Sequence, residues 1–279
     1  MRALRVFVAG GAALLALGAA LFKLGLLGNP WSGFERDTLN PGFQSPATPG
    51  NLGVPFKNVR IESGTRALAG FFVAAPTDCK KPVAILIFHG RNETIADWIG
   101  PQKRFRDACI ASLSFDYSGH GNSSGPGTIS NLNSDGPAAY ATLLKLTAHA
   151  RHCLFSHSMG GGPMLWVASS SRAAPDCIVI ASPFSSLRSM AQREGMPKLL
   201  GALMPVVWDN SERIQRVRAP LLWIHSRDDH TIPIDEGRQV YDAAAHPKQA
   251  LILADLSHNS IYKEMPDSIW VPMIKFIRG

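Results

Sequence analysis

Residues 152–170 read His-Cys-Leu-Phe-Ser-His-Ser-Met-Gly-Gly-Gly-Pro-Met-Leu-Trp-Val-Ala-Ser-Ser, and they give the strongest indication of how the chain folds. It is typical of a strand, a sharp turn and a helix, with Ser158 at the turn. Ser156 and Gly160 stand two positions either side of Ser158, and their small size lets the strand and helix backbones approach closely. The pattern predicts an exposed serine hydroxyl on a tight turn. The alternative is an ordinary serine at a strand end.

A second serine matches the pattern G-x-S-x-G more literally. Ser123 stands in Gly-Asn-Ser-Ser-Gly at residues 121–125, after a strand-like run at residues 110–117. The following residues, Gly-Pro-Gly-Thr, do not begin a helix, because Pro and Gly at this density break helices. Ser123 is therefore predicted to lie in a loop, which leaves Ser158 as the candidate nucleophile.

Length and charge narrow the class of protein. The 279 residues, 46% of them hydrophobic, fit one large α/β domain with a sizeable core. The net charge of +7 comes from Lys and Arg that are scattered along the chain, without a run of five or six. Since no basic stripe is interleaved with aromatic residues, we expect no nucleic-acid partner.

Residues 1–28 are predicted to be a targeting segment. Arg2 and Arg5 precede an apolar run over residues 6–27, in which Lys23 is the only charged residue. A run of about 20 apolar residues can span a bilayer, and basic residues before it favour export of the chain beyond the run. The segment is interpreted as a signal peptide or an uncleaved anchor. We expect an exported, periplasmic or otherwise extracytoplasmic protein that contacts the membrane if the segment is retained.

The rest of the chain predicts an extended linker and one α/β domain. Residues 29–55 are rich in Pro, Gly, Asn and Ser without periodicity, which is typical of a linker. The domain is expected over residues 56–279, beginning with an antiparallel hairpin at the sheet edge formed by residues 56–62 and 68–74. Beyond it, strands alternate with helices, which is typical of a mostly parallel, doubly wound sheet. The expected strands are 83–88, 110–115, one ending before Ser158, 177–181, 221–225 and 250–253. The expected helices are 95–108, 132–150, one ending near 171, 235–245 and 269–277. Mixed helical structure over 185–217 is expected to form a short cap.

From about residue 56 onward the chain resembles small α/β-hydrolase domain proteins of the ABHD13 and ABHD17 type and their bacterial relatives. The motifs that carry this resemblance are Phe88-His89-Gly90, the run Asp116-Tyr117-Ser118-Gly119-His120-Gly121-Asn122-Ser123-Ser124-Gly125, Ser156-His157-Ser158-Met159-Gly160, Ser182-Pro183-Phe184-Ser185-Ser186-Leu187 and Ser257-His258-Asn259. Such proteins include esterases, thioesterases and peptidases. The resemblance implies the α/β-hydrolase fold and a nucleophile at Ser158.

The resemblance also implies a catalytic triad in the chain order Ser, Asp, His. A serine hydroxyl is a weak nucleophile at neutral pH and needs a base that is oriented by a carboxylate. His258, after the last strand, is the predicted base. Two aspartates, Asp228 and Asp229, follow the preceding strand; the D-x-x-x-P spacing of the family falls on Asp229 with Pro233, so Asp229 is preferred and Asp228 remains the alternative.

An oxyanion hole is implied by the same resemblance. In this fold the donors are backbone N–H groups of the residue after the nucleophile and of the loop after the third strand. Met159 and Arg91 occupy these places, with Arg91 replacing an Asn that is common after His-Gly. The Arg91 side chain either covers the rim of the site or meets an anionic substrate group.

These residues predict a serine hydrolase, of the carboxylesterase or thioesterase type, that acts on a small-molecule acyl substrate. A serine peptidase or amidase of the same fold is the alternative, and an exported binding protein without activity is a more distant one. We expect no cofactor and no metal, because the chain has no phosphate loop and its Cys and His residues lack metal-ligand spacing. Acyl length, leaving group and oligomeric state do not follow from the sequence.

Four cysteines each precede or begin a predicted strand. In the strand order usual for the resembled fold, the strands after Cys79 and Cys109 are neighbours, as are those of Cys153 and Cys177. Neighbouring strands lie about 4.8 Å apart, within the range of about 4.4 to 6.8 Å for Cα atoms of a disulfide. With export to an oxidising compartment, we predict the disulfides Cys79–Cys109 and Cys153–Cys177. The alternative is four buried free thiols.

Overall fold

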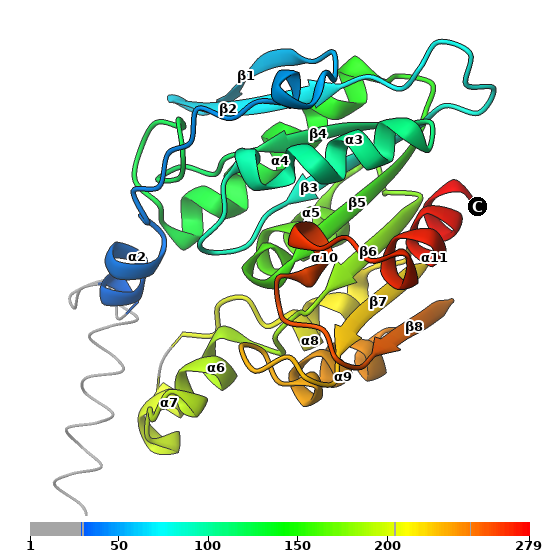
Figure 1. Cartoon of the computed structure of the whole chain (residues 1–279). Coiled ribbons are helices and arrows are strands. Elements are labelled where there is room, and N and C mark those ends of the chain that lie inside the picture. Colours follow the sequence, from blue (N-terminus) through cyan, green and yellow to red (C-terminus); the bar gives the residue numbers. More distant parts are fainter. Residues whose placement is uncertain (1–28, 30, 204, 246) are drawn as a thin grey trace, which may run out of the picture.

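The structure, a computed structural model, describes residues 29, 31–203, 205–245 and 247–279. Its centre is an eight-stranded sheet with the order β1-β2-β4-β3-β5-β6-β7-β8 (Figure 1). The β1–β2 and β2–β4 pairings are antiparallel, and all others are parallel. The strands are β1 (Lys57–Ser63), β2 (Arg66–Val73), β3 (Val83–Phe88), β4 (Ile110–Phe115), β5 (Arg151–His157), β6 (Cys177–Ala181), β7 (Leu221–Ser226) and β8 (Lys248–Leu253).

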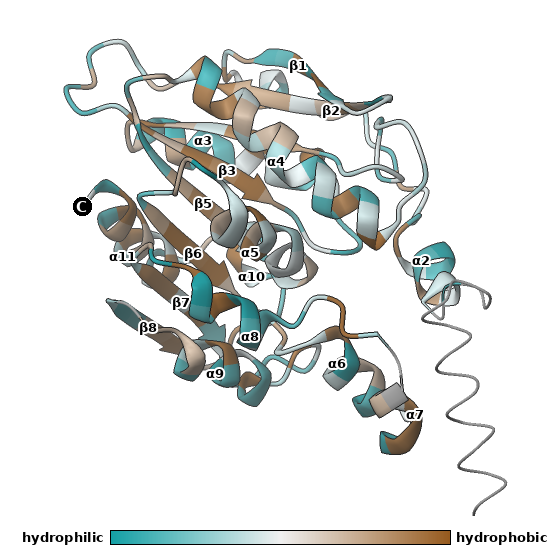
Figure 2. Cartoon of the chain, turned by 180° about the vertical axis from the view of Figure 1, so that it is seen from behind, coloured by the Kyte–Doolittle hydropathy of each residue, from teal (hydrophilic) through white to brown (hydrophobic). Residues whose placement is uncertain are grey.

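Helices cover both faces of the sheet. One face packs against α4 (Ile129–Leu146), α5 (Gly161–Ser170) and α9 (Ile234–Ala243), and the other against α3 (Ile99–Asp107) and α11 (Asp267–Arg278). The central strands β3, β5 and β6 are predominantly hydrophobic (Figure 2), because parallel strands buried on both faces have no polar side. In β3, Ala84, Leu86 and Phe88 join the first core, and Val83, Ile85 and Ile87 join the second. The predicted parallel, doubly wound sheet with its edge hairpin is confirmed.

The element boundaries differ from the predictions by a few residues. Helix α4 begins at Ile129 and not at Leu132, because the Thr128 side chain accepts a hydrogen bond from the Asn131 N–H and caps the helix there. Strand β8 begins at Lys248, two residues before the apolar residues that predicted it. The cap between β6 and β7 is short, as predicted, and consists of α6 (Leu187–Arg193), α7 (Lys198–Leu203), α8 (Asn210–Arg213) and the 3₁₀ turn η4 (Ile214–Arg216).

The prediction that residues 29–55 are extended is wrong in part. The segment contains helix α2 (Ser32–Thr38) and the 3₁₀ turn η1 (Pro49–Leu52). Tertiary contacts stabilise α2: the Trp31 and Leu39 side chains at its ends are buried, and the Glu35 carboxylate accepts a hydrogen bond of 2.9 Å from the Ile129 N–H of α4. Packing therefore overrides the weak helical preference of this sequence.

The predicted targeting segment, residues 1–28, lies outside the described residues. Within the part of the chain that the structure does describe, no helix is long and apolar enough to cross a membrane.

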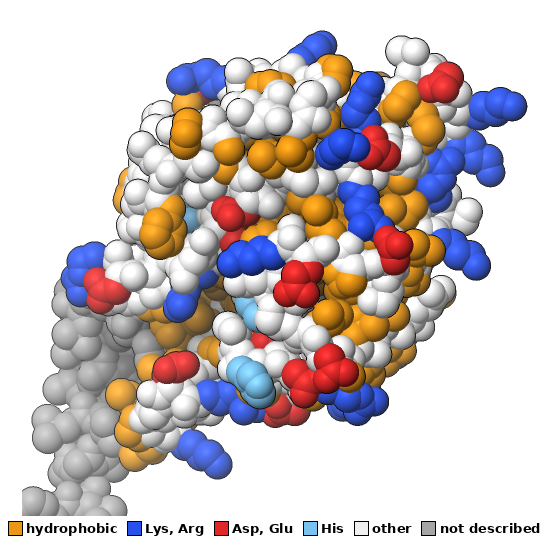
Figure 3. Space-filling model, viewed as in Figure 1, with side chains coloured by type: hydrophobic (Ala, Val, Ile, Leu, Met, Phe, Trp, Pro, Cys, Tyr) orange, Lys and Arg blue, Asp and Glu red, His pale blue; other side chains and the backbone are white. Residues whose placement is uncertain are grey.

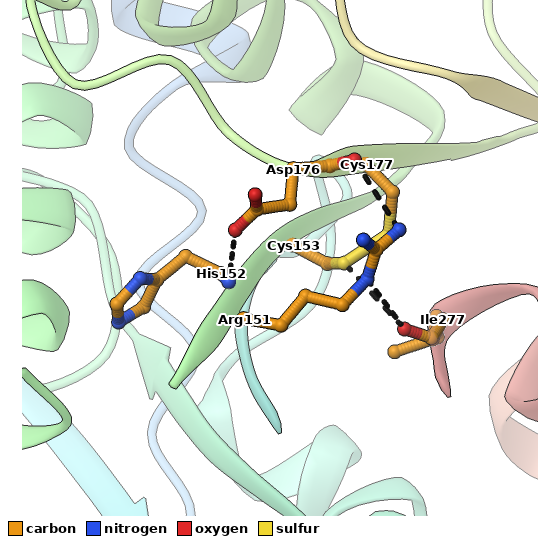
Figure 4. The surroundings of a disulfide bond; sticks show 6 residues. All are labelled: Arg151, His152, Cys153, Asp176, Cys177 and Ile277. Carbon is orange, nitrogen blue, oxygen red and sulfur yellow. Dashed lines mark hydrogen bonds between the residues drawn. A yellow bond between two sulfur atoms is a disulfide. The ribbon is translucent and has the colours of Figure 1, made fainter. Parts of the chain in front are cut away.

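Both predicted disulfides are present. Cys79 and Cys109 are bonded with Cα atoms 5.7 Å apart, and Cys153 and Cys177 are bonded with Cα atoms 4.7 Å apart. Cys153 and Cys177 are register partners in the parallel strands β5 and β6, so the second bridge joins two central strands near their amino ends. Next to it, the Arg151 guanidinium donates hydrogen bonds to the carbonyl oxygens of Ile277 and Asp176 (Figure 4). This edge of the sheet is fastened covalently, opposite the edge that carries Ser158.

Candidate active site

Ser158 lies on a sharp turn between a central strand and a helix. Strand β5 ends at His157, the 3₁₀ turn η3 (Ser158–Gly160) comes next, and α5 begins at the residue after it. Ser158 has φ of +53°, a left-handed conformation that strains a residue with a side chain. At Gly160 a Cβ atom would lie only 2.3 Å from the Phe88 carbonyl oxygen, so the close approach of turn and strand requires glycine. The local geometry therefore matches the strand-turn-helix predicted from the sequence.

The predicted base and acid are in contact. His258 Nδ1 lies 2.7 Å from Asp229 Oδ2, and both side chains are largely buried. The other carboxylate oxygen of Asp229 accepts hydrogen bonds from the backbone N–H groups of Thr231 and Ile232, at 3.0 and 2.9 Å. Asp228 instead accepts a hydrogen bond from the Asp255 N–H at 2.7 Å. The structure thus brings Asp229, and not Asp228, to His258.

The environment keeps the two groups in the protonation states that a base and its orienting acid need. Burial alone would raise the pKa of Asp229, but the hydrogen bond and charge of His258 and the N–H of Ile232 lower it to about 2. Burial lowers the pKa of His258, which the hydrogen bond to Asp229 raises only in part. His258 is therefore neutral at neutral pH and able to accept a proton.

Ser158 and His258 line one cavity of about 510 Å³. Figure 3 shows a hollow with hydrophobic side chains on this side of the molecule. The apolar wall comes mainly from α2, the turn at Ser158 and the segment around α6, and the remaining wall carries charged and polar groups. The apolar residues are Phe34, Met159, Phe184, Leu187, Met190, Trp208, Ile232 and Tyr262, and the polar ones besides Ser158 and His258 are Arg91, Asn92, Glu93, Asp97, Glu194, Thr231, Asn259 and Lys263.

The two predicted oxyanion donors, Met159 and Arg91, both belong to this cavity. The loop that carries Arg91 is held from outside the cavity. The His120 ring lies 3.2 Å from the Arg91 carbonyl oxygen, and the Tyr117 hydroxyl donates to the His89 carbonyl oxygen at 3.1 Å. A fixed loop suits a donor that must not rearrange during a reaction.

Ser123 lies in a loop, as predicted, and does not line the cavity. Its hydroxyl donates to the Asp116 carbonyl oxygen at 2.6 Å and accepts from the Ala69 N–H at 2.9 Å. These contacts fasten the loop to β2, which gives Ser123 a structural role.

Sequence reasoning missed two buried residues of the site, Glu93 and His157. Glu93 Oε1 lies 2.7 Å from His157 Nδ1, directly beside Ser158. Glu93 follows an apolar strand and His157 ends another. Because the carboxyl ends of parallel strands meet at one edge of the sheet, these two positions were the signal in the sequence that could have identified the residues. Among the residues that the structure describes, no group of His, Cys, Asp and Glu could hold a metal ion.

The sheet order, the helices on both faces and the strained turn at Ser158 define an α/β-hydrolase fold. A family model described as "Serine aminopeptidase, S33" matches residues 80–212. The chain is 28% identical to human "Protein ABHD12B", over 51% of this chain and 44% of that protein. It is 25% identical to the uncharacterized protein YfhR of Escherichia coli K12, over 77% of this chain and 78% of YfhR.

A solved structure supports the same fold. The Pyrococcus furiosus esterase Pf2001 superposes with a TM-score of 0.69 at 19% identity, covering 86% of this chain and 97% of that one. The chain spans less than half of the length of ABHD12B, so the likeness covers only part of that protein.

Proposed function

We propose that the protein is a serine hydrolase that cleaves an ester or thioester through an acyl-enzyme on Ser158. The observation that carries this proposal is the hydrogen-bonded pair of His258 and Asp229, which opens onto the same cavity as the strained Ser158. A nucleophile on a tight turn, a neutral imidazole and a buried carboxylate are the parts that acyl transfer needs.

In this mechanism Ser158 Oγ attacks the acyl carbon while His258 Nε2 takes the hydroxyl proton. Asp229 keeps the second proton on His258 Nδ1 and stabilises the imidazolium that forms. The N–H groups of Met159 and Arg91 donate to the oxyanion. The tetrahedral intermediate collapses, and the alcohol or thiol leaves with the proton from His258. Water, activated by His258, then releases the acid and restores Ser158.

The cavity wall supports an acyl group with apolar character. Phe34, Phe184, Leu187, Met190 and Trp208 offer a hydrophobic surface beside Ser158, which suits an acyl chain better than a polar one. An esterase among the structural relatives, Pf2001, and a zebrafish relative named "Lysophosphatidylserine lipase ABHD12" at 24% identity support ester cleavage. The family description, serine aminopeptidase, supports the second candidate, a serine peptidase or amidase.

We further propose that the protein is exported, with residues 1–28 as signal peptide or membrane anchor. The two disulfides are consistent with an extracellular protein, because such bonds persist in oxidising compartments.

A fluorophosphonate probe tests the proposal, since it labels an activated serine. The full chain should be labelled, Ser158→Ala should not be, and Ser123→Ala should be labelled like the wild type. Labelling of Ser158→Ala would refute the assignment of the nucleophile. Turnover of p-nitrophenyl esters of increasing acyl length, compared with peptide anilides, separates esterase from peptidase.

A further inference from the structure

Glu93 and His157 form a buried pair at the floor of the site. Glu93 lies in the loop after β3, and His157 is the last residue of the neighbouring strand β5. Their exposed fractions are 4% and 0%, and Glu93 Oε1 lies 2.7 Å from His157 Nδ1. Burying a carboxylate is costly without partners, so both oxygens of Glu93 should be satisfied.

The second oxygen of Glu93 holds the loop that carries Arg91. Glu93 Oε2 accepts hydrogen bonds from the Gly90 N–H at 2.7 Å and from Trp98 Nε1–H at 3.0 Å. A Cβ atom on Gly90 would lie 2.3 Å from Glu93 Oε1, so the carboxylate occupies the space that a larger residue would need. The Glu93 carboxylate therefore holds the backbone of Gly90, the residue directly before Arg91.

The other end of the pair holds the predicted base. His157 Nε2 lies 2.9 Å from the carbonyl oxygen of His258, and the two imidazole rings lie 4.6 Å apart. The Trp98 and Tyr262 rings lie near the His157 ring, with centroids 6.2 and 5.5 Å from it, and the His157 side chain is fully buried. The backbone of His258 is thus tied to β5, the strand that carries Ser158.

The hydrogen-bond partners determine the charge of His157. A carboxylate and a carbonyl oxygen only accept hydrogen bonds, so the ring donates from both nitrogens and is an imidazolium. Burial alone would raise the pKa of Glu93, but the charge and hydrogen bond of His157 lower it to about 2, so the proton is on the histidine. Burial would lower the pKa of His157, and the charge and hydrogen bond of Glu93 raise it.

We propose that Glu93 and His157 are positioning residues: as a buried ion pair they hold the predicted oxyanion loop and the base loop in place on the two sides of Ser158. This inference deepens the proposed serine hydrolase function and rests on it. Neither residue touches the reacting atoms, and the pair acts through the Arg91 N–H and through His258.

The pair also affects the base electrostatically. The charge of His157 lowers the pKa of His258, and the more weakly acting charge of Glu93 raises it. The pair as a whole therefore keeps His258 neutral at lower pH. Other titratable or charged groups around the two histidines are Asp229, His225, His89, Tyr117, Tyr262, Asp97, Arg91 and Lys263.

The ion pair can be detected in the unmodified full chain. In ¹⁵N NMR spectra, His157 should show two protonated ring nitrogens at pH 8, where an ordinary histidine is neutral. Loss of a ring proton from His157 below pH 7 would overturn the proposal. This measurement needs no substrate, so it remains decisive if the probe shows that the protein is not a serine hydrolase.

The effect on catalysis is tested with Glu93→Gln, which keeps the shape and removes the charge. The Gln amide can donate to a neutral His157 and its oxygen can accept from Gly90, so the loops stay in place. We expect the acid limb of kcat/KM to be displaced to higher pH. Glu93→Ala, which also removes the hydrogen bonds, should lower kcat on the order of 100-fold with little change in KM.

Asp135→Asn is the matched control. Asp135 is also a fully buried carboxylate, bonded to Ser63, Arg66 and Ser118, but it does not line the cavity. Its substitution should destabilise the fold and leave the acid limb unchanged. An acid limb of Glu93→Gln that coincides with the wild type would reduce the pair to a structural role and overturn the proposal. If Glu93→Gln does not fold, the NMR result on the wild type decides.

Discussion

Replacing Asp229 by Asn should almost abolish turnover, for a reason visible in its contacts. The Oδ1 atom of Asp229 accepts two backbone N–H groups, from Thr231 and Ile232, so an Asn must keep its oxygen there and turn its NH₂ group toward His258. His258 Nδ1 must then accept, which moves the ring proton to Nε2, the atom that should take the proton of Ser158. We expect a loss on the order of 10⁴-fold in kcat, about 5.4 kcal/mol of transition-state stabilisation.

The assay is hydrolysis of a p-nitrophenyl ester at saturating substrate, with circular dichroism to verify the fold. Asp228→Asn is the matched control, because the neighbouring carboxylate accepts from the Asp255 N–H at 2.7 Å and makes no contact with His258 among the described residues. It should keep kcat within a few-fold of the wild type. A loss below tenfold in Asp229→Asn, or equal losses in the two variants, would refute the reasoning about the ring proton.

Three further outcomes are expected. Because burial lowers the pKa of His258 and the base must be neutral, the acid limb of kcat/KM should have its midpoint below the ordinary histidine value of 6.5; a midpoint above 6.5 would contradict this sign. Ser123→Ala should leave kcat unchanged and cost about 1 to 2 kcal/mol in denaturant unfolding, since its two hydrogen bonds are structural; a large loss of activity would place Ser123 in the mechanism. Replacing both Cys153 and Cys177 by Ala should lower the free energy of unfolding by about 3.5 kcal/mol, as estimated for a bridge across 24 residues, with kcat unchanged; an unchanged unfolding midpoint would count against this estimate.

The parallel sheet was predictable because its signals are local. Each central strand is a short run of apolar residues, and parallel strands of this kind are joined by helices on both faces. The disulfide partners followed from the strand order of the resembled fold, because neighbouring strands bring cysteines at their amino ends together. Neighbouring strands also bring together the residues that follow their carboxyl ends. The contact of Asp229 with His258 agrees with the sequence-based expectation for this reason.

The features that the sequence did not reveal depend on contacts between distant segments. Glu93 and His157 are 64 positions apart, and neither residue alone distinguishes a buried ion pair from two loop residues. Helix α2 also depends on distant contacts. Its seven residues, without a capping side chain, give no periodic signal in the sequence. The helix forms because the Trp31 and Leu39 side chains are buried against the domain. Such features are decided by packing, which a linear pattern does not encode.

Helix α2 has a practical consequence for anyone who expresses this protein without its apolar N-terminal residues. Phe34 forms part of the cavity wall, and the Trp31 indole donates to the Pro205 carbonyl oxygen at 3.3 Å, next to the cap. A truncation at residue 56, just before β1, would keep every strand of the sheet and yet remove Phe34 from the cavity wall. A recombinant version should therefore begin no later than residue 29. A shorter version would have an altered cavity wall, so the substrate selectivity measured with it would not be that of the full chain.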